Sequence, residues 1–334
     1  MPRSIKHKPT IKDIQTLTGL SLGCISKFLN GGNVTQENKI KLEAAIKEVG
    51  YKVDIYARGM ITGQTKSVGL IIPELSNTFY GILSSSISKN LMNVGYDVIV
   101  NEHYDDADLE KNIISKMLSR RVDAIILVPA SNKKEDYSDV DINKIVFLDG
   151  FVDGLDADFV LVNNKEISTE VVKYLYKAGH TRIAAVISDN TFTGNERRKG
   201  FIEGCKQCNI DYSDLIFTYQ NNVNNAYDVI ENIMQSGKYT AIFASNYIAT
   251  LGAIFYLNEK NYNVPFDISV VGFDNIMLTK LFKPQLTIVS QPMEEIAEKC
   301  VERTLELIRG NKQKRTTDVL SCKLERGHTV EIEF

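Results

Sequence analysis

The spacing of apolar residues changes near residue 66 and divides the chain into two unlike parts. Before that point, apolar residues recur every three or four positions in three short segments, a periodicity typical of amphipathic helices. In "IKDIQTLT" these residues are Ile11, Ile14 and Leu17, and in "LSLGCISKFL" they are Leu22, Ile25, Phe28 and Leu29. In "QENKIKLEAAIKEVG" the candidates for closing a small core are Ile40, Ala44 and Val49.

Cap and stop residues mark the ends of these three segments. Thr10, followed by Asp13, resembles the start of the first helix, and Gly19 ends it. Ser21 is a suitable cap for the second helix, which "NGGN" ends, and Thr35 caps the third. Two helices joined by a tight, glycine-containing turn form the helix-turn-helix plan, in which the second helix enters the DNA major groove. The alternative is a small three-helix bundle used for protein contacts.

After residue 66, short apolar runs alternate with helical stretches. "SVGLIIP", "YDVIVNEH", "DAIILVPA" and "KIVFLDG" are rich in β-branched residues, as in buried strands of parallel sheets. A second series follows with "RIAAVIS", "LIFTYQ", "TAIFASN" and "ISVVGFDN". Two successive βα series predict two α/β lobes with a cleft between them.

The distribution of charge supports a nucleic-acid contact confined to the first part. The chain has 334 residues and a net charge of −3, yet residues 1–65 hold ten Lys and Arg against five Asp and Glu. A basic head on an acidic body favours DNA as the partner of the head. No apolar run is long enough to span a membrane, and no apolar stretch follows the basic N-terminus as in a secretory signal. We therefore expect a cytoplasmic protein with no membrane partner.

Catalytic signatures are missing from the sequence. There is no phosphate-binding loop of the G-x-x-x-x-G-K-[ST] type, no G-x-G-x-x-G after a strand and no G-x-S-x-G elbow. The four histidines are dispersed, and the one C-x-x-C, Cys205 and Cys208, lacks the two further ligands of a zinc site. We expect no catalytic residues, no metal site and no cofactor, and hence binding rather than turnover.

Longer stretches of the chain resemble the LacI/GalR family of transcriptional regulators. The resemblance runs through residues 9–80 and continues in "GHTRIAAVIS", "NERRKGF", "IFASN", "SVVGFDN", "TIVSQP" and "LERGHT". It implies an all-α helix-turn-helix head with a hinge helix, followed by a two-lobed α/β sensor with parallel sheets, like that of periplasmic binding proteins. The implied domains are a head at 1–53, a hinge and linker at 54–65, a first lobe at 66–162 plus 292–322, and a second lobe at 163–291 plus 323–334.

The resemblance also implies which residues contact the operator. The recognition helix starts after Ser21, and Leu22 and Gly23 occupy the positions that usually choose the operator bases. Lys27 stands where many relatives have arginine; it can donate to guanine but lacks the rigid fork of arginine. The remaining expected contacts are Thr10, Ser26 and Asn30. Leu22 has a second interpretation, packing inside the head, because its spacing to Ile25 and Phe28 permits it.

The segment "DIYARGMITG" corresponds to the hinge helix of the family. It is too short to be a stable helix alone in water, and in the family it folds on operator DNA. Met60 occupies the position of the leucine that the family wedges into a central minor-groove step, and apolar side chains suit that role. Arg58 is expected to contact a phosphate or the groove edge.

The effector residues implied by the resemblance follow the strands of the two lobes. They are Phe79, Tyr80, Asp149, Arg197, Tyr219, Asn246 and Asp274. Aromatic faces combined with aspartate, asparagine and arginine suit a polyhydroxylated ring, so the expected effector is a sugar or sugar derivative, acting as inducer or as corepressor. The alternative for Asp149 and Asp274 is that they cap the helices after their strands. The chain departs from the family in having Tyr247 after Asn246, and Gly150 where arginine is frequent.

Two further expectations concern assembly and competing classes. The chain ends directly after the last family motif, without the heptad-bearing tail of tetrameric members, so we expect a homodimer on a near-palindromic operator. A solute-binding protein of a sugar transporter shares the two-lobed fold, but it would carry an export signal and no basic head. An enzyme with a Rossmann-like sheet would need a phosphate loop or an acid–base constellation.

Overall fold

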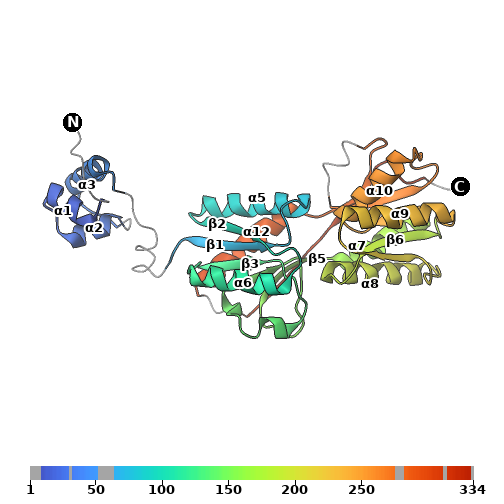
Figure 1. Cartoon of the computed structure of the whole chain (residues 1–334), viewed down its shortest axis with the longest axis horizontal. Helices are drawn as coiled ribbons and strands as arrows, with labels where there is room; N and C mark the ends of the chain where they lie inside the picture. Colours follow the sequence, from blue (N-terminus) through green and yellow to red (C-terminus); the bar gives the residue numbers. More distant parts are fainter. Residues whose placement is uncertain (1–8, 30–31, 52–63, 275–281, 311–313, 332–334) are drawn as a thin grey trace. The chain divides into compact units, whose positions relative to one another are not determined.

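A computed structural model describes residues 9–29, 32–51, 64–274, 282–310 and 314–331. The chain divides into two compact units, Met1–Lys66 and Ser67–Phe334 (Figure 1). The predicted hinge, with Arg58 and Met60, lies outside the described residues, and so does Asn30. None of the helices in the described ranges has the length and apolarity needed to cross a membrane.

The first unit consists of three helices around a small apolar core. These are α1 (Ile11–Thr18), α2 (Leu22–Leu29) and α3 (Gln36–Val49). Ile14, Ile25 and Leu42 are completely buried, one from each helix. On α3 the buried stripe is Leu42, Ala45 and Val49, spaced three and four residues apart as a helix requires.

Two of the predicted core positions in this unit are wrong. Ile40 is 59% exposed, and Ala44 is also exposed. Helix α3 carries apolar residues on two neighbouring faces. Only the face that contains Leu42 packs against Ile14 and Ile25. Burial of that face leaves Ile40 and Ala44 toward solvent.

The predicted helix ends are confirmed. The Asp13 carboxylate accepts hydrogen bonds from the Thr10 backbone N–H at 2.7 Å and from its hydroxyl at 2.8 Å. The Ser21 hydroxyl accepts from the Cys24 N–H at 3.2 Å, and the Thr35 hydroxyl accepts from the Asn38 N–H at 3.4 Å. Gly19 ends α1 with φ of 69°, a left-handed conformation that glycine adopts without strain.

The second unit contains two α/β lobes, each built on a sheet. The first sheet has the order β11-β5-β4-β3-β1-β2, and all its neighbouring strands are parallel. Its strands are β1 (Ser67–Ile72), β2 (Asp97–Glu102), β3 (Ala124–Leu127), β4 (Ile145–Leu148), β5 (Asp158–Val162) and β11 (Thr317–Leu320). The runs predicted as the first βα series form β1 to β4.

The second sheet has the order β12-β10-β9-β8-β6-β7 and is parallel except for the pair β10 and β12. Its strands are β6 (Ile183–Ser188), β7 (Ile216–Tyr219), β8 (Ala241–Ala244), β9 (Ser269–Phe273), β10 (Thr287–Ser290) and β12 (Lys323–Glu325). The second predicted series forms β6 to β9. The expectation of a two-lobed α/β fold with parallel sheets is therefore confirmed.

Helices cover both faces of each sheet, because alternate residues of a buried strand point to opposite sides. In the first lobe, α5 (Thr78–Asn93) and α12 (Met293–Ile308) pack on the face of Val68 and Leu70, whereas α6 (Ala107–Ser119) packs on the face of Ile71. In the second lobe, α7 (Asn164–Lys177) and α8 (Phe192–Gln207) cover one face, and α9 (Val223–Ser236) and α10 (Tyr247–Glu259) cover the other. Figure 1 shows α5 and α6 on opposite sides of the strands. Two short 3-10 helices, η1 (Lys134–Tyr137) and η2 (Ile142–Lys144), precede β4.

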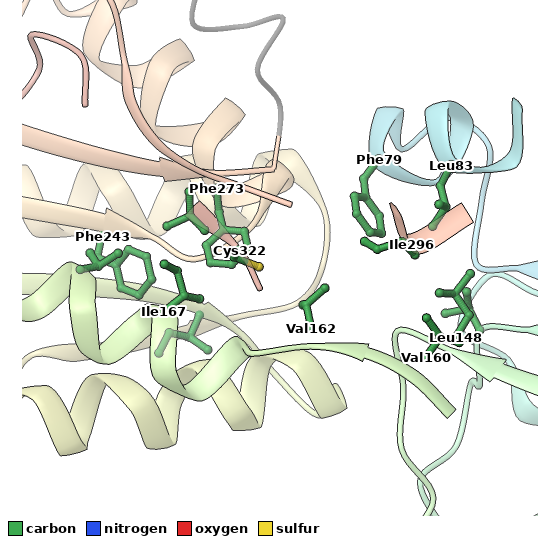
Figure 2. Packing of buried hydrophobic residues seen from close by; sticks show 14 of the residues in the cluster. Phe79, Leu83, Leu148, Val160, Val162, Ile167, Phe243, Phe273, Ile296 and Cys322 are labelled. Carbon is green, nitrogen blue, oxygen red and sulfur yellow. The ribbon is translucent and has the colours of Figure 1, made fainter. Parts of the chain in front are cut away.

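The chain passes between the lobes three times. It crosses from β5 to α7, from β10 to α12 and from β11 to β12. Figure 2 shows the resulting core as two groups of side chains, one with Phe79 and Leu83 and the other with Phe243 and Phe273, with Val162 on the segment between them. The three crossings join the two lobes. Residues that follow strands of both sheets line a common cavity.

Candidate effector cleft and helical head

A polar cavity of about 410 Å³ lies between the two lobes of the second unit. Its volume falls in the range of small-molecule sites. It is lined by residues that follow strands of both sheets, the place where open α/β folds bind ligands. Six of the seven residues predicted for the effector line it: Phe79, Tyr80, Asp149, Arg197, Asn246 and Asp274.

One aspartate from each lobe lies at an equivalent place in this cavity. Asp149 follows β4 and Asp274 follows β9, with φ angles of 53° and 82°. Aspartate is among the few residues that adopt a left-handed backbone readily. Burial raises the pKa of Asp149 to about 7; the Arg197 charge opposes this rise, and the negative charge of Asp274 adds to it. The two carboxylates are therefore close enough for the charge of Asp274 to disfavour ionisation of Asp149.

The hydrogen bonds of Asp149 differ from the helix-capping alternative, whereas the segment 275–281 that follows Asp274 lies outside the described residues. The Asp149 carboxylate accepts from the Tyr80 hydroxyl at 3.2 Å, and the loop 150–157 rather than a helix follows it. The Asp274 carboxylate accepts from the backbone N–H of Tyr247 at 3.2 Å and from the Gln291 side-chain amide. Burial also raises the pKa of Asp274, against the effect of Arg197. Both side chains thus bind segments distant in sequence.

Arg197 on α8 is buried behind the cavity with only 3% of its surface exposed. Its Nε donates to the Asn164 side chain at 2.7 Å, and its Nη1 donates to the Ser245 carbonyl at 2.7 Å. The guanidinium carbon lies 3.8 Å from the centre of the Phe273 ring, a cation–π distance. The same group that reaches the cavity therefore also holds α7, α8 and the end of β8 together.

The predicted aromatic pair starts α5. Asn77 caps this helix by accepting from the Phe79 N–H at 3.1 Å. The rings of Phe79 and Tyr80 are 5.0 Å apart and nearly perpendicular. Phe79 is 6% exposed, and burial raises the pKa of Tyr80, as does the nearby charge of Asp149. Tyr80 thus offers its hydroxyl to Asp149, whereas Phe79 contributes an apolar wall.

Tyr219 is the predicted effector residue that the structure does not place at the cavity wall. It is 4% exposed, and its hydroxyl donates to the Asn246 side-chain oxygen at 2.6 Å. That same oxygen accepts from the Ala249 N–H at 2.8 Å and caps α10. Tyr219 therefore orients Asn246, and a position at the carboxyl end of a strand was insufficient to distinguish a residue that lines the cavity from one that supports it.

Several lining residues were missed by the sequence reasoning. Gln291 lies in the "TIVSQP" crossing, and its side-chain amide donates to the Asp274 carboxylate. Its position in that motif is the one sequence signal that could have indicated a role at the cavity. Tyr247, noted above as a departure from the family, also lines the cavity. Its side-chain hydroxyl accepts a hydrogen bond from the Thr78 hydroxyl at 2.9 Å. Thr78 belongs to the first lobe and Tyr247 to the second, so this bond spans the cleft. The rings of Phe151 and Phe192, 6.0 Å apart, also join the lobes.

Gly150 lies where a larger side chain has no room. A Cβ added there would approach Pro129 Cγ to 2.4 Å, and both residues line the cavity. The arginine frequent at this position in the family could not occupy the same backbone path. Within the described ranges, no group of three or more His, Cys, Asp or Glu side chains is arranged to hold a metal ion.

In the helical unit, the described residues predicted to contact DNA lie along α2 and at the caps of α1 and α2. Ser21, Gly23 and Lys27 are exposed, Ser26 is half-buried, and Thr10 is exposed before α1. Leu22 is 44% exposed, so the alternative in which it packs inside the head is wrong. The apolar face of α2 is carried by Ile25, Phe28 and Leu29, and Leu22 lies off that face. An exposed leucine on a short helix is available to a partner.

A two-lobed α/β unit with a polar cavity at the facing strand ends, preceded by a small helical unit, defines a ligand-binding sensor of the periplasmic-binding type. The chain belongs to the family described as periplasmic binding proteins and sugar binding domain of LacI family, whose model matches residues 65–326.

Relatives along the whole chain are transcriptional regulators. The transcriptional repressor PurR of Mannheimia succiniciproducens is 28% identical over 316 residues, covering 92% of this chain and 94% of that protein. The transcriptional regulator DegA of Bacillus subtilis is 27% identical, covering 92% of this chain and 93% of that protein. The lac repressor dimer, solved with operator and the anti-inducer ONPF, aligns with a TM-score of 0.87 at 20% identity over 97% of this chain and all of that one. This last likeness establishes the fold.

Proposed function

We propose that this protein is a DNA-binding transcriptional regulator, acting as a repressor, whose operator affinity is controlled by a small effector bound in the cleft. The observation that carries this proposal is the joining, in one chain, of a basic three-helix unit to a two-lobed ligand-binding unit. A transporter's solute-binding protein has use for the second unit alone. The similar regulators PurR and DegA align over both units, which agrees with the proposal.

The first unit acts as a helix-turn-helix head at 1–53 in this proposal. Helix α2 enters the major groove, where its exposed Leu22, Gly23 and Lys27 face the bases and the neighbouring phosphates. Leu22 offers apolar contact, which suits a thymine methyl, and Lys27 donates to guanine. Thr10, Ser21, Ser26 and Asn30 supply further contacts. The hinge at 54–65 brings Arg58 and Met60 to the minor groove, with Met60 as the apolar wedge.

The effector is a polyhydroxylated compound, a sugar or sugar derivative, in this proposal. Hydroxyl groups donate well to carboxylates, and Asp149 and Asp274 present one from each lobe. The aromatic wall of Phe79 suits the apolar face of a sugar ring. Because the cavity is walled by both lobes, a ligand that bonds to both favours the closed arrangement over an open one.

The active form is a homodimer in this proposal, so that two heads read a near-palindromic operator. The first lobe exposes large apolar side chains suited to an interface: Ile82 is 41% exposed, Met92 67% and Val94 49%. Val94 lies in a shallow groove with Val301 and Leu305 of α12. Exposed apolar area of this kind marks protein contact sites. Effector binding changes the lobes of both protomers and, through the hinges, the spacing of the heads.

The test is a DNA-binding titration with purified protein. Near-palindromic duplexes are first selected from a random pool by the protein, and the fluorescence anisotropy of the selected duplex is then followed with and without a panel of sugars. We expect tight binding that a sugar changes at least tenfold. Lys27→Ala should weaken operator binding without changing sugar affinity. Asp149→Asn should weaken sugar binding without changing the operator affinity of the sugar-free protein. Failure to select any duplex would overturn the regulator, and a response to none of the sugars would overturn the effector claim.

A further inference from the structure

The charges that line the cleft are strongly unbalanced. Four aspartates reach the cavity: Asp149 and Asp274 at its inner end, and the exposed Asp105 and Asp189 at its rim. Among the lining residues that the structure describes, Arg197 is the one cation. Burial raises the pKa of Asp149 to about 7, so at neutral pH this carboxyl is charged only in part. A cleft walled by one sign of charge focuses its field, so the four aspartates together still give this cavity a negative potential toward an arriving ligand.

Arg197 does not offset this imbalance for a ligand. Two of its donors bond the Asn164 side chain and the Ser245 carbonyl, and its guanidinium stacks on Phe273. With 3% of its surface exposed, it is held as part of the wall. A phosphate or carboxylate needs several convergent donors, and this fixed guanidinium presents only a small part of its surface to the cavity.

Two buried acceptors lie among the polar groups of the cavity wall. Gln291 is 4% exposed and lines the cavity, and its side-chain oxygen has no hydrogen-bond partner among the described residues. The Gln291 amide is turned toward Asp274, which leaves that oxygen as the orphan. A buried acceptor without a donor is rare in folded proteins and is satisfied when a ligand supplies the donor. The Asp149 carboxylate, with the Tyr80 hydroxyl as its neutral donor, adds a second acceptor at the inner end.

We propose that the cleft selects a donor-rich effector that carries no anionic group, namely a neutral or amine-bearing polyol, and that it excludes phosphorylated and carboxylated sugars. This inference rests on the proposed function, because it assigns the charge class of the same effector. A neutral ring donates hydroxyls to Asp149, Asp274 and Gln291. An ammonium group in place of one hydroxyl adds an ion pair at the inner end, whereas a phosphate meets carboxylates there and leaves the Gln291 oxygen unpaired.

Titration calorimetry of the full-length protein with matched sugars tests this inference. Each series holds stereochemistry constant and varies charge: glucose, glucosamine, glucose 6-phosphate and glucuronate, with the corresponding galactose and mannose series and with ribose and ribose 5-phosphate. In the series that binds, we expect the amine to bind at least as tightly as the neutral parent. The phosphate and the acid should bind at least about a hundredfold more weakly, because their negative charge is repelled by the negative charge of the cleft.

Variants separate charge selection from shape. Asp149→Asn and Asp274→Asn keep size and tolerate the left-handed backbone, as aspartate does. Each should reduce the discrimination against the phosphate by about tenfold and abolish any advantage of the amine. Asp139→Asn, at a side chain that is 77% exposed and outside the cavity lining, is the matched control and should change neither.

The outcomes distinguish this inference from the proposed function. A phosphosugar or uronic acid that binds as tightly as its neutral parent overturns the charge selection and leaves the regulator intact. Discrimination that persists unchanged in both Asn variants also overturns it, because shape alone would then explain the exclusion. If no member of any series binds or changes operator affinity, the sugar effector itself is refuted.

Discussion

Glu110 offers a test of the packing beneath the cleft. This side chain on α6 is 2% exposed; it accepts from the Ala130 N–H at 2.6 Å and from the Tyr137 hydroxyl at 2.9 Å. Ala130 lines the cavity, so Glu110 positions one of its walls. Burial raises the pKa of Glu110 from 4.5 to about 7, against the effect of these two bonds, and nearby Asp136 and Asp105 add to the rise.

The sign of the pH dependence follows from the raised pKa. Between pH 4.5 and 7 the folded protein holds this proton more tightly than the unfolded chain, so stability falls as pH rises through that window. At 1.36 kcal/mol per pH unit, the full loss is about 3 kcal/mol. Glu110→Gln cannot ionise, yet its carbonyl can accept from Ala130 and its amide can donate to the Tyr137 oxygen. We expect the variant to retain about 2.5 kcal/mol more stability than wild type on going from pH 5 to pH 8, because a small part of the loss already occurs below pH 5.

The measurement is urea unfolding of the full chain at pH 5 and pH 8, followed by circular dichroism because the chain contains no tryptophan. The quantity compared is the loss of unfolding free energy between pH 5 and pH 8, to which Asp149 contributes equally in both proteins. The exposed Glu135→Gln, in the adjacent η1, is the control and should lose as much as wild type. An equal loss in Glu110→Gln and wild type, within about 0.5 kcal/mol, would refute the buried, titrating carboxyl.

Three further substitutions probe the head, the lobe core and the cleft. Gly23→Ala should stabilise the head by about 0.5–1 kcal/mol in urea unfolding and change operator affinity less than threefold, because an added Cβ meets nothing closer than the Ser21 hydroxyl at 4.0 Å. Gly200→Ala should lower the unfolding free energy by about 2 kcal/mol or more, since its Cβ would lie 2.1 Å from the Lys165 carbonyl; an unchanged midpoint would contradict this packing. Tyr247→Phe deletes the bond to Thr78, worth about 1 kcal/mol, so the effector Kd should rise about fivefold by calorimetry if closure assists binding.

The parts of the fold that were predictable are those fixed by local pattern. Buried parallel strands are continuous apolar runs, so "SVGLIIP" and "RIAAVIS" were identified as strands without tertiary information. Helix caps are equally local, because Ser21 and Thr35 bond within three residues. The carboxyl ends of the parallel strands of one sheet share one edge, and two such lobes were expected to enclose a cleft, so Asp149 and Asp274 could be expected at one cavity.

What escaped prediction depends on contacts between distant segments. The choice between two apolar stripes on α3 is made by α1 and α2, so Ile40 could not be excluded from the core by its own spacing. Gln291 acquires its role only through the Asp274 carboxylate, 17 residues earlier, and Tyr247 only through Thr78, 169 residues earlier. Tyr219 ends β7 and Asn246 follows β8, and their sequence positions alone do not indicate that Asn246 lines the cavity while Tyr219 bonds to it.

Under the proposed function, the placement of one carboxylate in each lobe couples ligand binding to closure. Closing the cleft brings Asp149 toward Asp274, and the charge of each disfavours ionisation of the other. In an empty closed cleft the two carboxylates therefore repel each other, and the charge of Arg197 offsets this repulsion in part. The Thr78–Tyr247 hydrogen bond and the Phe151–Phe192 contact favour the closed form against it. A ligand that donates to both carboxylates removes the repulsion and adds bonds found only in the closed form. Its affinity for the closed state exceeds that for the open one by this difference, which is the requirement for an effector that shifts a two-state equilibrium.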